Sequence, residues 1–226
     1  MTLDLNRIQA ICFDVDGTLS DTDDLYVEKL AGWIKPLLTW AGDRDPLKIS
    51  RRLVMAVEGP ANFMIGLPDL LGLDDELDKV IDWMARHSRH KPEPFKLISG
   101  VDGMLAQLYS QFPLAVVSAR DERSTNRFLI ETSLAGYFHV VATTQTCVHT
   151  KPFPHPILWA ASEMGVYPGA CLMVGDTSVD MRAGRTAGAQ TAGVLCGFGE
   201  RHELERSGAD MILESTSDLV DILGKQ

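Results

Sequence analysis

Two pairs of aspartates stand out among the residues of this sequence that could do chemistry. Asp14 and Asp16 lie two residues apart directly after an apolar run, and Asp176 and Asp180 follow another apolar run far along the chain. If the chain stays extended through Val15, the first two carboxylates lie on one side of it. Four carboxylates in one pocket would repel each other and raise their pKa values, so we expect a cation among them.

The residue types favour Mg²⁺ and a phosphoryl group. The aspartates offer only oxygen ligands, which suit Mg²⁺ better than zinc or copper. Ser118 and Lys151, after two further apolar runs, add a hydroxyl and a positive charge. A metal ion, an ammonium and a hydroxyl together form an environment for a dianionic phosphoryl group. Taken alone, each such residue is more often a turn former, a helix cap or a solvated charge, but their joint order favours a site.

A scaffold must bring these residues together from separate strands. Apolar runs bounded by polar or turn-forming residues predict buried strands at 8–14, 114–118, 138–142, 171–175 and 190–195, with a weaker one at 211–213. Helical patterns fall between the later strands, at 101–108, 121–129, 157–164 and 178–187. This alternation predicts an α/β fold with a doubly wound, Rossmann-like parallel sheet, whose ligands gather beyond the carboxyl ends of the strands at a topological switch point.

Residues 21–94 show helical periods and little strand character, which predicts an inserted α-helical cap domain. The stretch Lys91-Pro92-Glu93-Pro94 predicts a stiff linker back to the first domain. We therefore expect an α/β core domain made of residues 1–20 and 95–226, with the cap domain between its two parts.

The composition indicates which binding partners and which cellular compartment to expect. The 226 residues are 45% apolar and 23% charged, which is typical of a globular protein, and the net charge of −10 disfavours nucleic acid and anionic lipid. Four cysteines without a C-x-x-C pair indicate reduced core thiols. The sequence predicts neither a secretory signal nor a membrane span, so we expect a cytoplasmic enzyme.

The complete set of motifs resembles the haloacid dehalogenase-like hydrolase superfamily. Residues 13–22, F-D-V-D-G-T-L-S-D-T, are similar to its first motif, Ser118 to its second, Lys151-Pro152 to its third and Gly175-Asp176-x-x-x-Asp180 to its fourth, in the required order. The insertion after the first motif resembles the small cap of the phosphoglycolate phosphatase and β-phosphoglucomutase branch. The resemblance implies a Mg²⁺-dependent phosphatase of small phosphorylated metabolites.

The resemblance also implies roles for individual residues. Asp14 would attack phosphorus to give an aspartyl-phosphate that water then hydrolyses, and Asp16 would act as general acid and base. Mg²⁺ would lie between Asp14, the Asp16 carbonyl and Asp176, with Asp180 holding metal waters or Lys151. Asp16 argues against carbon–halogen chemistry, because the dehalogenases of the superfamily lack it.

Further contacts are expected around the substrate. The implied substrate-binding residues are Gly17, Thr18, Ala119 and Arg120. Relatives often carry Asn-Lys in place of Ala119-Arg120, and we expect Arg120 to contact the phosphate or an acidic leaving group. Three other functions stay open: a phosphosugar mutase of the same branch, a phospho-accepting signalling domain, and a non-catalytic interaction protein.

Overall fold

The computed structural model describes residues 3–21 and 95–224. The chain divides into two compact units, one made of residues 1–23 and 95–226 and the other of residues 24–94. The predicted cap lies outside the described residues, apart from Asp21. The first unit contains every residue predicted to form the site.

The described residues form a six-stranded parallel sheet with the order β3-β2-β1-β4-β5-β6. Its strands are β1 (Ala10–Phe13), β2 (Leu114–Val117), β3 (Val140–Ala142), β4 (Cys171–Gly175), β5 (Gln190–Val194) and β6 (Met211–Leu213). Each lies within a predicted run. The strand order changes direction between β1 and β4, which confirms the doubly wound sheet and puts the topological switch point beside β1.

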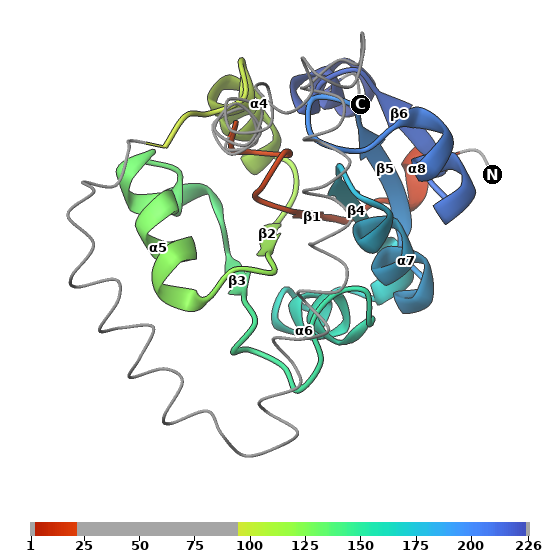
Figure 1. Cartoon of the computed structure of the whole chain (residues 1–226), viewed down its shortest axis with the longest axis horizontal. Helices are drawn as coiled ribbons and strands as arrows, with labels where there is room; N and C mark the ends of the chain where they lie inside the picture. Colours follow the sequence, from red (N-terminus) through yellow and green to blue (C-terminus); the bar gives the residue numbers. More distant parts are fainter. Residues whose placement is uncertain (1–2, 22–94, 225–226) are drawn as a thin grey trace, which may run out of the picture. The chain divides into compact units, whose positions relative to one another are not determined.

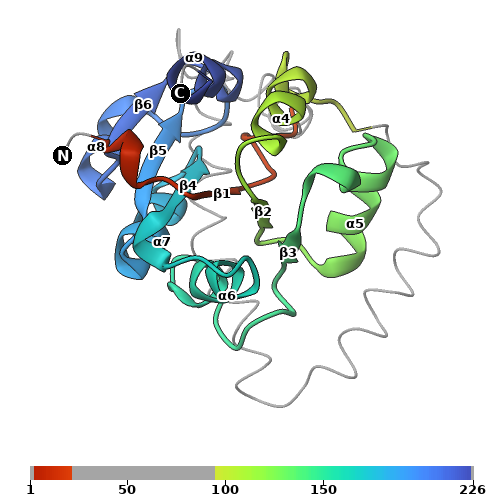
Figure 2. The ribbon, with the colours of Figure 1, turned by 180° about the vertical axis from the view of Figure 1, so that it is seen from behind.

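Helices cover both faces of this sheet. They are α4 (Val101–Tyr109), α5 (Glu122–Glu131), α6 (His155–Glu163), α7 (Ser178–Ala187), α8 (Arg201–Ser207) and α9 (Leu219–Leu223), with 3-10 turns at Leu5–Arg7, Ala135–Tyr137, Pro168–Ala170 and Thr216–Asp218. Figures 1 and 2 show α4 and α6 on opposite sides of the sheet. No helix in the described ranges has the length and apolarity that crossing a bilayer requires.

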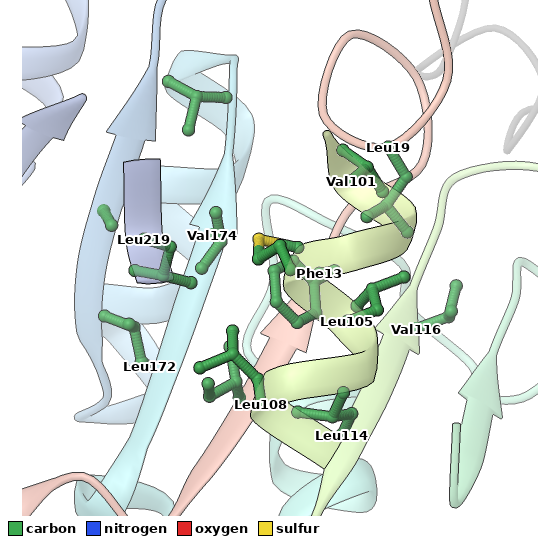
Figure 3. Close-up of a cluster of buried hydrophobic side chains, with 14 of the residues drawn as sticks. Phe13, Leu19, Val101, Leu105, Leu108, Leu114, Val116, Leu172, Val174 and Leu219 are labelled. Atoms are coloured by element: carbon green, nitrogen blue, oxygen red, sulfur yellow. The ribbon is translucent and has the colours of Figure 1, made fainter. Parts of the chain in front are cut away.

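The core consists of two apolar layers, one on each face of the sheet. On one face Phe13 and Leu172 pack with residues of α4 and α9, including Leu105 and Leu219 (Figure 3). On the other face Cys12 and its neighbours pack with residues of α6 and α7. Because successive residues of β1, β2 and β4 are buried on alternate faces, these strands are apolar throughout, as the sequence predicts. All four cysteines lie in the described ranges and are free.

Candidate active site

Asp14, the first aspartate of the predicted site, follows β1 at the topological switch point. The backbone N–H of Asp14 donates to the carbonyl oxygen of Val174 in β4 at 3.0 Å, which holds the residue in line with the sheet. The chain then turns sharply, and the amides of Leu19 and Ser20 donate to the carbonyl oxygen of Val15 at 2.9 and 2.8 Å. Gly17 has a φ of +69° in this turn, a conformation that favours glycine. The turn leaves the Asp14 side chain buried at the carboxyl end of the sheet.

A buried lysine joins the first and fourth motifs. Lys151 lies in the loop after β3, and its Nζ donates to Asp14 Oδ1 at 2.6 Å and to Asp180 Oδ1 at 2.7 Å. Burial opposes the charge of Lys151, but the two carboxylates outweigh burial and raise its pKa above the usual value. Lys151 therefore stays cationic and neutralises part of the acidic cluster.

Asp180 has a second structural task in the first turn of α7. Its Oδ2 accepts hydrogen bonds from the backbone N–H and the hydroxyl of Thr177, at 3.1 and 2.6 Å. Thr177 is the N-cap of the helix, and the two residues form a capping box. The cap thus fixes one oxygen of Asp180 and directs the other to Lys151.

Asp176 is fully buried and is held by a loop that our sequence analysis did not single out. Its Oδ2 accepts from the backbone N–H of Phe198 at 2.8 Å, and its Oδ1 lies 3.5 Å from the hydroxyl of Thr18. A Cβ at Gly197 would overlap the Asp176 carboxylate, and one at Gly199 would overlap the Asp176 carbonyl oxygen. The sequence feature that could have identified this loop is the Gly-x-Gly turn at 197–199, which follows the predicted strand at 190–195.

Three of the four predicted carboxylates converge. Asp14, Asp176 and Asp180 each offer a carboxylate oxygen, and these oxygens lie within 4.8 Å of one another. The pKa of Asp14 is raised to about 7, mainly by burial and also by the charges of Asp180 and Asp16, although the attraction of Lys151 lowers it. Since Lys151 balances only one of three buried carboxylates, and all the donors are oxygens, the cluster fits a divalent cation such as Mg²⁺.

The carboxylate of Asp16 points to a different partner. Its Oδ2 accepts from Arg120 Nε at 2.6 Å, and its Oδ1 accepts from Arg120 Nη2. Arg120, which we expected to contact substrate, therefore binds the predicted general acid in this structure. A metal contact through the main-chain carbonyl of Asp16 remains a prediction.

The remaining predicted residues line the same edge of the sheet. Ser118 follows β2 and is buried, and its Oγ accepts from the backbone N–H of Arg120 at 3.1 Å. Thr18 and Gly17 are buried in the turn after β1, whereas Ala119 is half-buried. Their contacts with a substrate remain predictions.

Comparison with known proteins identifies the family. A sequence-family model described as haloacid dehalogenase-like hydrolase matches residues 11–194, a range that includes every site residue from Asp14 to Asp180. The chain belongs to this family. The family that the sequence motifs resemble is thereby confirmed, and this haloacid dehalogenase-like hydrolase is an enzyme whose acidic cluster lies at the carboxyl edge of its sheet.

Curated relatives resemble the hydrolase over nearly its whole length. Pyrophosphatase PpaX of Anoxybacillus flavithermus is 33% identical over 96% of this chain and 98% of its own length. A phosphoglycolate phosphatase of Nitrosococcus oceani is 27% identical over 98% and 99%. A solved structure of a haloacid dehalogenase-like hydrolase from Streptococcus pneumoniae aligns with a TM-score of 0.68 at 20% identity, over 96% of this chain and 99% of that one, and supports the fold.

Proposed function

We propose that this hydrolase is a Mg²⁺-dependent phosphatase that hydrolyses a small phosphate monoester, phosphoglycolate-like or a sugar phosphate, through an aspartyl-phosphate on Asp14. The observation that carries the proposal is the buried Asp14 carboxylate, which is bonded to Lys151 at 2.6 Å and faces two further aspartates. Relatives named as a pyrophosphatase and a phosphoglycolate phosphatase support phosphoryl transfer as the reaction class.

The reaction takes two steps. A carboxylate oxygen of Asp14 attacks phosphorus in line and forms an O–P bond, while the bond to the leaving oxygen breaks and that oxygen takes a proton from Asp16. A water molecule then attacks the aspartyl-phosphate, Asp16 takes a proton from this water, and Asp14 is released together with inorganic phosphate.

The other side chains position the reacting groups and neutralise negative charge. Asp14, the Asp16 carbonyl and Asp176 would hold Mg²⁺, with Asp180 beside them. When bound, the ion offsets the negative charge of the phosphoryl oxygens. Lys151 holds Asp14 in place and adds a positive charge, and the Ser118 hydroxyl donates to a phosphoryl oxygen.

The remaining parts of the proposal concern substrate size and compartment. A helical cap at residues 21–94 would exclude bulk water and admit small metabolites rather than phosphoproteins. Four free cysteines agree with a cytoplasmic enzyme. The acidic net charge disfavours nucleic acid as a substrate or partner.

The direct test is phosphate release from a broad panel of monoesters, with and without Mg²⁺. We expect turnover of small esters that requires the metal and is abolished in Asp14→Asn, while Asp102→Asn, an exposed aspartate on α4, keeps wild-type activity. Isomerised ester without free phosphate would favour the mutase, and a lasting phosphoenzyme without turnover would favour the signalling domain. Activity on bulky phosphopeptides alone would contradict the small-substrate proposal.

A further inference from the structure

Two backbone carbonyls in the turn after β1 accept hydrogen bonds from side chains that lie far along the chain. The hydroxyl of Thr216, a residue of the 3-10 turn after β6, donates to the carbonyl oxygen of Thr18 at 2.6 Å. The thiol sulfur of Cys196, just after β5, lies 3.5 Å from the carbonyl oxygen of Gly17 and 3.4 Å from the Thr216 hydroxyl. Thr216 and Thr18 are fully buried. The second half of the sheet therefore holds the turn that contains the first motif.

The number of available protons fixes the direction of these bonds. Thr216 has one hydroxyl proton, and this proton is donated to Thr18. The Thr216 oxygen can then only accept from Cys196, whose S–H is shared between this oxygen and the carbonyl of Gly17. The thiol thus orients the hydroxyl, and the hydroxyl fixes the carbonyl of Thr18.

Capping of its own helical turn does not account for the Thr216 hydroxyl. The 3-10 turn Thr216–Asp218 begins with a capping box formed by the side chains of Ser215 and Asp218. In this box Asp218 Oδ2 accepts from the backbone N–H of Ser215 at 2.9 Å. These two neighbours satisfy the start of the turn, whereas the Thr216 hydroxyl is bonded to the turn after β1.

The turn after β1 leads directly to the acidic cluster. The Thr18 hydroxyl lies 3.5 Å from Asp176 Oδ1, at the upper limit for a hydrogen bond, so a shift of Thr18 by a few tenths of an ångström would break this contact. The same turn carries the main-chain carbonyl of Asp16, a proposed metal ligand. A Cβ at Gly197 would overlap both the Asp176 carboxylate and the carbonyl oxygen of Gly17, so these groups are closely packed. Movement of the turn would therefore disturb the cluster.

We propose that Thr216 is a positioning residue for the metal site, acting through Thr18 on the oxygens that would hold Mg²⁺. The proposal rests on the proposed function, because it takes the Asp16 carbonyl and the Asp176 carboxylate as metal ligands. Without the Thr216 hydroxyl, the buried carbonyl of Thr18 loses this hydrogen bond, and the turn shifts to satisfy it elsewhere. Residues that orient metal ligands through hydrogen bonds change the affinity for the ion although they do not touch it.

Thr125 in α5 provides a matched control. It is as fully buried as Thr216, and its hydroxyl likewise donates to a main-chain carbonyl, that of Asp121, at 2.9 Å. Thr125→Val and Thr216→Val thus make the same chemical change, but the first makes it outside the turn after β1 and the acidic cluster.

The test measures the dissociation constant of Mg²⁺ by calorimetry on the isolated protein, the Tm in EDTA, and phosphate release at several Mg²⁺ concentrations. We expect Thr216→Val to raise the dissociation constant about 10-fold or more, and Thr216→Ser, which keeps the hydroxyl, to stay within about threefold of the wild type. Excess Mg²⁺ should restore most of the phosphate release of Thr216→Val. Thr125→Val should lower the Tm, as Thr216→Val does, but leave the Mg²⁺ affinity unchanged. Cys196→Ala should weaken Mg²⁺ binding less than Thr216→Val, because the bond from Thr216 to Thr18 remains.

The outcomes separate three situations. Unchanged Mg²⁺ affinity in Thr216→Val, an equal change in Thr125→Val, or a larger change in Cys196→Ala would overturn the role of Thr216 and leave the phosphatase intact. If Thr216→Val does not fold, Thr18→Val decides the matter, because it removes the hydroxyl that faces Asp176 but keeps the carbonyl that Thr216 binds. Weakened Mg²⁺ binding in Thr18→Val would then support the proposal, and unchanged binding would overturn it. A wild type that binds no Mg²⁺, or that releases no phosphate from any monoester, would instead overturn the proposed function.

Discussion

Lys151 donates a 2.6 Å hydrogen bond to Asp14, a residue 137 positions earlier in the chain. Both side chains are buried, and the same ammonium also binds Asp180. The amide of Asp14 is bonded to β4, and Asp180 is fixed by the helix cap at Thr177. The lysine therefore connects two rigidly held carboxylates and sets the position of the proposed nucleophile.

Replacing Lys151 by Met should impair both catalysis and stability. We expect kcat for phosphate release to fall about 100-fold or more, because a positive charge beside the transferred group is lost. The variant also leaves two buried carboxylates without their cation, which should lower the free energy of unfolding at neutral pH by about 3–5 kcal/mol. Denaturant unfolding measures the second effect.

Arg201→Gln is the control for this experiment. It breaks an exposed ion pair with Glu214, 2.7 Å between Nη2 and Oε1, and should cost no more than about 1 kcal/mol. Unchanged kcat in Lys151→Met would contradict the role assigned to the lysine.

Asp180→Asn separates the two tasks of Asp180. The amide oxygen can still accept from Thr177 and keep the cap, but Lys151 loses one of its two carboxylate partners. We expect circular dichroism to show the helix content preserved while kcat falls roughly 10-fold or more, because a charge-assisted bond that positions Lys151 is lost. Loss of the helical signal with unchanged kcat would mean that Asp180 acts only as a cap.

Gly197→Ala should weaken metal binding. The added Cβ would overlap the carboxylate of Asp176, so this side chain must move from the position that Phe198 fixes for it. We expect the dissociation constant of Mg²⁺, measured by calorimetry on the isolated protein, to rise about 10-fold or more. Gly136→Ala is the matched control, since a Cβ there meets no atom within 4 Å. Equal Mg²⁺ affinities in the two variants would show that Gly197 does not position Asp176.

The raised pKa of Asp14 makes the stability of the metal-free protein depend on pH. Its ordinary value is 3.8, whereas the folded protein, mainly through burial, holds it at about 7. Between these values the folded state keeps a proton that the unfolded state has lost, so stability falls as pH rises from about 4 to 7, and the loss is complete above 7.

Thermal unfolding checks this prediction against Asp14→Asn, which cannot ionise at this position. From pH 5 to pH 7.5 the Tm of the metal-free wild type should fall by several degrees more than that of the variant. Mg²⁺ should raise the wild-type Tm more at pH 7.5 than at pH 5, because it favours the ionised carboxylate. A Tm difference between the two proteins that does not change with pH would argue against a raised pKa of Asp14.

Local patterns were enough to predict the sheet and the residues at its edge. The strands are short apolar runs covered on both faces, and their order in the chain determines which ends share an edge, so Asp14, Ser118, Lys151 and Asp176 could be placed together. Residues 178–187 were predicted as a helix from their helical pattern, and the structure has α7 with these bounds, begun by the capping box of Thr177 and Asp180.

Contacts between distant side chains could not be predicted in the same way. Arg120 binds the carboxylate of Asp16 and lies beside the rings of Phe95 and Phe128, and no periodicity or motif in the sequence predicts these contacts. The role of Phe198 depends on a backbone N–H, which any residue type except proline would supply. The glycines beside it reveal the close approach only after Asp176 has been placed.

The nucleophilic role of Asp14 is tested most sharply by looking for a phosphoryl group on this residue during turnover. Enzyme mixed with substrate and Mg²⁺ is quenched in acid within milliseconds, digested and examined by mass spectrometry. We expect a phosphorylated peptide that contains residues 10–20, with the modification on Asp14, and none in Asp14→Asn. Sustained phosphate release with no acyl-phosphate on Asp14 at any quench time, or an Asp14→Asn variant that still turns over, would contradict this role.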